Sequence, residues 1–269
     1  MNSFIMPVEF SFQPSVIPKA AFQELDFRIL GHAYAIQNAY GNQLDEGTYQ
    51  DELARRLVLE GMEVRSEAGV MLSHGLFRRR YECDLVINDS VIIECKTVPD
   101  ILQIHKRQLL HYLFLTGIRF GRIVNFRPAS VQKWVMSNTL SARERLHPAY
   151  RFDSWKEPSA SPNFSEVVKE LVSDWGTGLF RGCYASGLAE NLPDSLRERS
   201  LPLMDGQRRI GKKAFNCIGD KSALFVTVYS GNLGPKKNNL QRLLHLTSLE
   251  EIHWVNVDLH EVTLTRILR

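Results

Sequence analysis

The stretch Tyr81–Lys96, YECDLVINDSVIIECK, predicts a β-hairpin. Residues 88–90 form a turn cluster between two apolar runs, which is typical of a short connection between strands. With Asp89 as the centre of the turn, Asp84 lies five residues before it and Glu94 five residues after it. In an antiparallel ladder, two such residues face each other with their Cβ atoms about 5 Å apart.

Two facing carboxylates repel each other, so this pairing is unfavourable unless a cation neutralises them. Lys96 lies two residues after Glu94 and therefore shares its strand face. A hard divalent cation bound by oxygen ligands would also resolve the repulsion. A surface hairpin with an ordinary cross-strand salt bridge is the alternative interpretation of Asp84, Glu94 and Lys96.

The composition indicates a globular protein with a full core. The chain has 269 residues, enough for one large domain or two modest ones, with 44% hydrophobic and 23% charged residues. The net charge of +3 permits a nucleic-acid partner without demanding one. No uncharged apolar run approaches the roughly 18 residues of a transmembrane helix, and the N-terminus lacks a secretory signal pattern, so we expect no membrane association.

The chain has four cysteines without a CxxC pair or a zinc or iron–sulfur spacing: Cys83, Cys95, Cys183 and Cys217. We therefore expect reduced thiols in a cytoplasmic protein. Strand alternation places Cys83 and Cys95 on the face opposite to the two acids, which predicts that both are buried.

Hydrophobic periodicity predicts an α/β order in the first half. After an extended arm with an edge strand near 8–12, we expect helices at 25–40 and 46–60, strands at 62–72, 76–87 and 91–98, a helix at 100–116, and a strand at 120–126. Asp100 is the expected N-cap of the helix at 100–116, and Gly117 is its expected end.

The remainder is more irregular. Residues 127–163 are rich in proline and loop residues, and we place a linker at 129–163 between domains 1–128 and 164–269. Beyond the linker we expect a helix at 164–175, an irregular polar segment at 190–209, a strand at 224–229, a helix at 239–246, and strands at 252–257 and 262–268.

Three patches indicate an internal repeat. Residues 41–53 match 176–188 at an offset of 135, residues 90–93 match 222–225 at 132, and residues 108–125 match 239–256 at 131. The alternative is that any two helix–strand segments share leucine and glycine at similar periods. In the repeat, Glu94 aligns with Val226 and Lys96 with Val228, so the second copy lacks the acids of the first.

The first half also resembles a known group of enzymes. Asp84, followed by Glu94-Cys95-Lys96 on the next strand, is similar to the D…ExK signature of the PD-(D/E)XK nuclease superfamily, whose core has the order α, three strands, α, strand. Gln108 and Tyr112 form a QxxxY on the following helix, as in the RecB-like branch.

The resemblance is greatest to the GxxExxY proteins of this superfamily and covers about residues 28–128. Glu46 and Tyr49 supply the ExxY. Gln43 stands where the motif has glycine, although Gly41 lies nearby. This departure bears on the geometry of the loop more than on the chemistry.

The resemblance implies metal-dependent hydrolysis of phosphodiester bonds, with Mg²⁺ or Mn²⁺ as cofactor and DNA, rather than RNA, as substrate. The implied metal ligands are Glu46, Asp84, Glu94 and the backbone carbonyl of Cys95. The implied catalytic residues are Asp84, Glu94, Lys96, Gln108 and Tyr112. Expected contacts to nucleic acid come from Arg78, Arg79, Arg80 and Tyr49. Partial burial would lower the pKa of Lys96 and the carboxylates would raise it, and the sequence leaves this balance open.

We therefore expect an α/β protein with two PD-(D/E)XK-like halves (αβββαβ), the first intact and the second degenerate. The alternative function is a nucleic-acid-binding or assembly module that cuts nothing, which the missing motif glycine and the modest net charge favour. A further hypothesis is that the second half substitutes for a dimer partner, which would make the chain a pseudo-dimeric monomer. The oligomeric state stays open.

Overall fold

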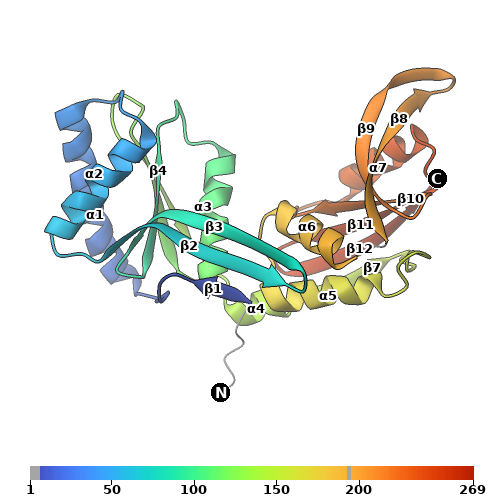
Figure 1. The fold of residues 1–269 in the computed structure, drawn as a ribbon, viewed down its shortest axis with the longest axis horizontal. Coiled ribbons are helices and arrows are strands. Elements are labelled where there is room, and N and C mark those ends of the chain that lie inside the picture. The colour runs from blue at the N-terminus through green and yellow to red at the C-terminus, as the bar shows by residue number, and fades with distance from the viewer. Residues whose placement is uncertain (1–6, 193–194) are drawn as a thin grey trace. The chain divides into compact units, whose positions relative to one another are not determined.

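The computed structural model describes residues 7–192 and 195–269. The chain divides into two compact units, the first formed by Met1–Ser73 and Arg78–Leu140 and the second by His74–Phe77 and Ser141–Arg269. Each unit is built around one six-stranded sheet (Figure 1).

The first sheet has the strand order β1-β2-β3-β4-β5-β6, with β4 and β5 parallel. Its elements are β1 (Val8–Phe10), α1 (Lys19–Tyr40), α2 (Glu46–Leu59), β2 (Val64–His74), β3 (Phe77–Ile87), β4 (Val91–Lys96), α3 (Gln103–Thr116), β5 (Phe120–Asn125) and β6 (Gln132–Ser137). The predicted order α, three strands, α, strand is thus present as α2, β2, β3, β4, α3 and β5. The predicted edge strand is β1.

Helices cover the two faces of this sheet, with α1 and α2 on one side and α3 on the other (Figure 1). Apolar residues of α1 and α2, such as Ile29 and Leu53, form one core cluster with Ile93 and Cys95 of β4. Fully burying such side chains stabilises a fold by about 1.5–3 kcal/mol each. Because alternate strand residues point to opposite faces, residues 94 and 96 point away from this cluster, toward the side of α3.

The ends of α3 show one correct and one wrong prediction. Gly117 ends the helix with a φ of 73°, a left-handed conformation that glycine adopts without steric cost. The helix starts at Gln103 with Leu102 as N-cap, so Asp100 is not its cap. The backbone N–H of Ile101 instead donates to the Gln132 side chain at 3.0 Å, a contact with β6 that holds the segment before the helix.

The second sheet has the order β7-β12-β11-β10-β9-β8, with β10 and β11 parallel. Its unit contains α4 (Ala142–Leu146), β7 (Ala149–Asp153), α5 (Phe164–Trp175), α6 (Arg181–Asn191), β8 (Leu196–Asp205), β9 (Arg208–Ile218), β10 (Ser222–Thr227), α7 (Gly234–His245), β11 (Glu251–Val257) and β12 (Glu261–Leu268).

Two predictions for this region are wrong. The expected linker at 129–163 contains β6, α4 and β7, and the expected irregular segment at 190–209 contains all of β8 and the start of β9. These strands are short or highly exposed, so they lack the alternation of buried and polar residues that reveals a strand in sequence. The predicted helix at 164–175 coincides with α5.

The two units share their order of elements. Two helices, three strands, a helix and two strands follow each other as α1-α2-β2-β3-β4-α3-β5-β6 and as α5-α6-β8-β9-β10-α7-β11-β12. The same tyrosine contact recurs at an offset of 135. Tyr49 donates to the Gly41 carbonyl at 2.6 Å, and Tyr184 donates to the Gly176 carbonyl at 2.7 Å.

A second recurring contact lies at the ends of the parallel strands, at an offset of 131. The Asn125 amide group bonds to both the N–H and the C=O of Val98, and Asn256 does the same with Tyr229. The strand registers also correspond at 131, since Ile93 pairs with Arg122 in the first sheet and Leu224 with His253 in the second. The offset of 132 predicted for this strand is therefore one residue too large.

At this register, Glu94 corresponds to Phe225 and Lys96 to Thr227, rather than to Val226 and Val228. The antiparallel registers then make Phe215 the counterpart of Asp84 in the second sheet.

All four cysteines are free and buried, which confirms the burial expected for Cys83 and Cys95. Among the described residues, no helix combines the length and the apolar character needed to cross a membrane.

Candidate active site

Four oxygen acceptors surround the ammonium group of Lys96. Its Nζ lies 3.3 Å from Glu46 Oε1, 3.3 Å from Asp84 Oδ2, 3.4 Å from Glu94 Oε2 and 2.6 Å from the carbonyl oxygen of Cys95. These are the four groups that the sequence suggested as metal ligands. The fold brings them together from α2, β3 and β4, around one positive charge.

The end of the hairpin ladder positions Asp84. Regular pairing stops at Leu85 and Ile93, so Asp84 and Glu94 do not form the directly facing pair expected from the sequence. The Asp84 side chain instead accepts a hydrogen bond from the backbone N–H of Cys95 at 2.9 Å. The carboxylate is thus held beside β4, where it reaches the ammonium.

Glu46 enters from the first turn of α2. Its Oε2 accepts from the backbone N–H of Thr97 at 3.1 Å, while Oε1 faces Lys96. One turn further along α2, Gln50 donates to the backbone carbonyl of Asp84 at 3.0 Å. The sequence interpretation missed Gln50, although its i+4 spacing from Glu46 places both on one helix face.

Glu94 is the most deeply buried acid of the cluster, with 1% of its surface exposed. Neither of its carboxylate oxygens accepts a hydrogen bond of regular geometry, and Oε2 meets Lys96 Nζ as an ion pair at 3.4 Å. Burial raises the pKa of Glu94 to about 8, and the nearby charge of Asp84 adds to the increase, while Lys96 acts in the opposite direction. Burial also raises the pKa of Asp84. Two buried acceptors without a regular hydrogen bond are costly in a fold, and a bound cation would satisfy them.

The charge balance at Lys96, left open by the sequence, favours the protonated form. Burial is the largest effect and disfavours the charge, but the attraction of Glu94, Asp84 and Glu46 together outweighs it, so the pKa of Lys96 is raised. The ammonium is thus a permanent cation at neutral pH in this arrangement.

The donor set suits a hard divalent metal, because all four groups offer oxygen. Within residues 7–192 and 195–269, however, no three His, Cys, Asp or Glu side chains are close enough to one another to hold a metal ion as they stand. The acids are arranged around the ammonium. Metal binding by this cluster would therefore require its side chains to rearrange.

Gln108 and Tyr112 lie one turn apart on α3. The Gln108 amide donates to the Tyr112 hydroxyl at 3.4 Å, and Tyr112 is 7% exposed. Burial raises the pKa of Tyr112 to about 12, with a further contribution from the charge of Glu94. That electrostatic interaction places the tyrosine beside the acidic cluster.

The predicted nucleic-acid contacts divide into two groups. Arg78, Arg79 and Arg80 are exposed on β3, where Arg80 pairs with Glu82 at 3.0 Å. The prediction for Tyr49 is wrong, because its side chain is fully buried and its hydroxyl bonds to the backbone of the loop before α2.

Gln43, which stands where the motif has glycine, adds no backbone strain. Gly41 ends α1 with a φ of 73°, whereas Gln43 is not among the described residues with positive φ. The Gln43 side chain instead bonds to Asn42 at 2.9 Å.

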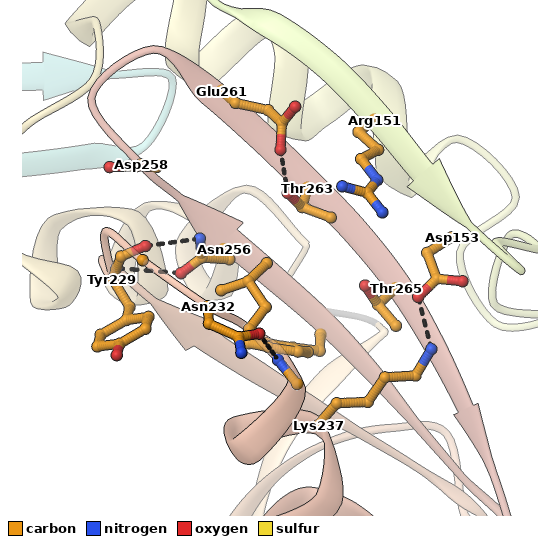
Figure 2. A pocket seen from close by; sticks show the side chains of 14 residues that line it. Arg151, Asp153, Tyr229, Asn232, Lys237, Asn256, Asp258, Glu261, Thr263 and Thr265 are labelled. Carbon is orange, nitrogen blue, oxygen red and sulfur yellow. Dashed lines mark hydrogen bonds and ion pairs between the residues drawn. The ribbon is translucent and has the colours of Figure 1, made fainter.

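A separate polar cavity of about 400 Å³ lies in the second unit (Figure 2). Thr263 and Thr265 line it at the ladder positions that Gln132 and Trp134 fill in the first unit, and these smaller side chains leave the space open. Acids of the cavity already have partners: Asp153 pairs with Lys237 at 2.6 Å, and Glu261 accepts from Thr263 at 3.0 Å. The acidic cluster belongs to the first unit, and none of its residues lines this cavity.

Comparison with known proteins gives a family match within the first half of the chain. Residues 23–136 match a family model described as the PD-(D/E)XK nuclease superfamily, and this segment contains the whole acidic cluster. The first half is thus similar to a superfamily of nucleases. No curated protein matches the chain.

A solved structure titled "Crystal structure of SSO0001" also matches, at 18% identity and a TM-score of 0.30. The match covers 46% of this chain and 61% of that chain, less than two thirds of its length. A likeness this loose supports no argument about residues.

Proposed function

We propose that the first unit is a metal-dependent nuclease that hydrolyses phosphodiester bonds, with DNA as the preferred substrate. The observation that carries the proposal is the convergence of Glu46, Asp84, Glu94 and the Cys95 carbonyl on one cationic position, where the buried oxygens of Glu94 lack a regular hydrogen bond. The similarity of residues 23–136 to the PD-(D/E)XK superfamily supports it.

In this proposal, the four oxygen groups would hold Mg²⁺ or Mn²⁺, and the ion would supply Lewis acidity to the reaction. Lys96, released from the centre, keeps its proton and stabilises negative charge on the attacked phosphate. Tyr112 stays protonated at neutral pH because its pKa is about 12, so its hydroxyl can donate a hydrogen bond, and Gln108 orients it. Gln50 and the Thr97 N–H keep Asp84 and Glu46 in place.

Incubation of the purified chain with Mg²⁺ or Mn²⁺ and a panel of single- and double-stranded DNA and RNA tests the proposal. We expect cleavage that requires metal and is lost in Lys96→Ala. Cleavage that survives Lys96→Ala unchanged, or metal binding without cleavage of any substrate in the panel, would contradict it.

We further propose that the second unit is a degenerate copy of the first, with domains at about 1–140 and 141–269. Support comes from the shared order of elements, the recurring Tyr49 and Tyr184 contacts, and the recurring Asn125 and Asn256 contacts. At the register of the sheets, the positions of Asp84 and Glu94 hold Phe215 and Phe225. The copy therefore has no means of binding a metal at that place.

A non-catalytic nucleic-acid-binding module is the second candidate. It is favoured by the ammonium of Lys96, which already neutralises the acids without a metal. Calorimetric titration with Mn²⁺ separates the two candidates. A nuclease site binds the ion and loses it in Glu94→Gln, whereas a purely structural salt-bridge cluster takes up none.

A further inference from the structure

The hairpin formed by β8 and β9, Leu196–Ile218, is the most basic element of the second unit. We call it the basic hairpin. It contains six basic and two acidic residues, a net charge of +4, whereas the whole chain carries +3. The rest of the chain is therefore slightly acidic. The six basic residues are Arg197, Arg199, Arg208, Arg209, Lys212 and Lys213.

All six of these side chains are exposed. The ladder pairs Pro202 with Lys212 and Leu201 with Lys213. Neighbouring pairs in a ladder point to opposite faces, so cations lie on both faces of the ribbon. Cations that only solvate one face of a sheet would lie on that face alone, so their presence on both faces indicates a different role.

Much of the basic hairpin is a two-stranded ribbon. The pairing of β9 with β10 covers residues 216–218, while its pairing with β8 extends to Arg208. In Figure 1 the turn between β8 and β9 extends away from the helices and remaining strands of its unit. One face of the ribbon packs against its own unit through Leu201 and Leu203, and the Met204 N–H donates to the Leu246 carbonyl at 2.7 Å. The opposite face and the turn at residues 205–208 are exposed to a partner.

Acidic neighbours neutralise few of these charges. Arg199 pairs with Asp220 and Arg208 with Asp205, each at 3.3 Å and each between exposed groups. Such pairs contribute little and are screened by salt. Lys212 and Lys213 form no ion pair with any residue in 7–192 or 195–269. Clustered, unneutralised cations repel one another, and a polyanion would relieve that repulsion.

The hairpin at the corresponding place in the first unit provides an internal comparison. Val64–Ile87 contains four basic and three acidic residues, a net charge of +1. The same supersecondary element therefore exists without a strong charge, so the hairpin fold itself does not require the basic residues of β8 and β9.

We propose that the basic hairpin binds the phosphate backbone of double-stranded DNA, as an interaction surface of the second unit. A two-stranded ribbon fits the major groove, which is about 12 Å wide and is lined by phosphates on both sides. Cations on both faces of the ribbon meet both phosphate rows. The identification of the partner as the nuclease substrate rests on the proposed function, whereas the binding itself does not.

The test uses the full chain with Arg209, Lys212 and Lys213 all changed to glutamine. A matched control changes three exposed cations outside the hairpin, Lys19, Lys156 and Arg181, to glutamine, which removes the same charge. Binding to a fluorescent 25-base-pair duplex, a length chosen as roughly two turns of DNA, is measured by anisotropy in EDTA at several salt concentrations. Circular dichroism verifies that both variants are folded.

We expect the hairpin variant to bind the duplex at least about tenfold more weakly near 0.1 M salt, and its salt dependence to fall by about 2–3 in slope, because three phosphate contacts are lost. The control should stay within about twofold of the unmodified chain. Equal losses in the two variants, unchanged binding in the hairpin variant, or tighter binding of the unmodified chain to the single strand than to the duplex would overturn the proposal.

The same measurement separates this proposal from the proposed nuclease. If the unmodified chain cuts no substrate but loses duplex binding in the hairpin variant, the hairpin proposal stands and the nuclease proposal fails. If the chain cuts DNA and the hairpin variant binds it normally, the reverse holds.

Discussion

The two units place opposite chemistry at corresponding positions of similar backbones. In the first, Asp84 and Glu94 flank a buried ammonium. In the second, Phe215 and Phe225 occupy the corresponding positions just beyond the paired part of the hairpin, with ring centroids 6.0 Å apart in an edge-to-face arrangement. Aromatic pairs of this kind contribute about 0.5–1.5 kcal/mol beyond the burial of their surface.

The difference shows what this scaffold accepts when packing alone decides. Phe215 and Phe225 join an apolar cluster with residues such as Leu201 and Trp254. The acids of the first unit are expensive by comparison, because Glu94 is buried without a hydrogen bond. Because the burial of Glu94 destabilises the fold, its position is better explained by a chemical role than by packing.

The largest expected effect is on catalysis. Glu94→Gln should lower the proposed cleavage by about 10³-fold or more, since the loss of a metal ligand removes several kcal/mol of transition-state stabilisation. The corresponding change in the second unit, Phe225→Leu, should leave the rate within a few-fold. Cleavage rates under single-turnover conditions check this contrast, and equal losses in the two variants would contradict it.

The next prediction concerns pH. The pKa of Glu94 is about 8 in the folded chain against an ordinary 4.5, so the folded state binds its proton more tightly than the unfolded state does. The free energy of unfolding of the metal-free first unit should therefore fall as the pH rises from about 4.5 to about 8, by an amount on the order of a few kcal/mol.

Glu94→Gln should flatten that pH dependence, because the amide does not titrate. Hydrogen exchange resolved by peptide, measured in EDTA at several pH values, follows the two units separately. The other ionisable groups facing Glu94 are Asp84, Lys96 and Tyr112, and all remain in the variant. A pH dependence that is the same in the variant would contradict the assignment to Glu94.

A third prediction concerns an asparagine contact that both units share. Asn125→Ala and Asn256→Ala each remove a side chain that bonds to both the N–H and the C=O of one residue, Val98 or Tyr229. Because both asparagines are buried, each change should cost its own unit about 2 kcal/mol or more. Denaturant unfolding combined with hydrogen exchange measures both losses. A large loss in one unit and none in the other would weaken the proposal of a repeat.

The smallest effect is expected at the tyrosines. Tyr49→Phe and Tyr184→Phe each remove a hydroxyl that accepts from one backbone N–H and donates to one carbonyl of the preceding loop. Each should destabilise its unit by about 1 kcal/mol, with little change in DNA binding, since both rings are buried. A selective loss of DNA binding in Tyr49→Phe would restore a direct role for that residue.

Much of the first unit could be predicted because its signals are local. The turn at residues 88–90 and the apolar runs beside it define the hairpin, and the glycine after α3 ends that helix. The convergence of Asp84, Glu94 and Lys96 follows from short spacings along two adjacent strands. Contacts with Glu46 could be suggested from the family resemblance alone, because α2 meets β4 only in three dimensions.

Failures occurred where tertiary contacts decide. Strand β6 is half exposed and is defined by its pairing with β5, so its own sequence carries little periodicity. The basic strand β8 and the start of β9 are exposed over most of their length, so their sequence predicts an irregular segment at 190–209. The motif resemblance predicts a nucleic-acid contact for Tyr49, because a sequence motif cannot show that the Tyr49 hydroxyl closes a buried loop.

The burial of all four cysteines has a practical consequence. A thiol that solvent cannot reach reacts slowly with maleimides and iodoacetamides, and burial also raises the pKa of Cys83, Cys95 and Cys217, which disfavours the reactive thiolate. The native thiols should therefore contribute little signal in thiol labelling. A single cysteine introduced at Gln207, in the exposed turn between β8 and β9, would carry a fluorophore or a cross-linker without prior removal of the natural thiols.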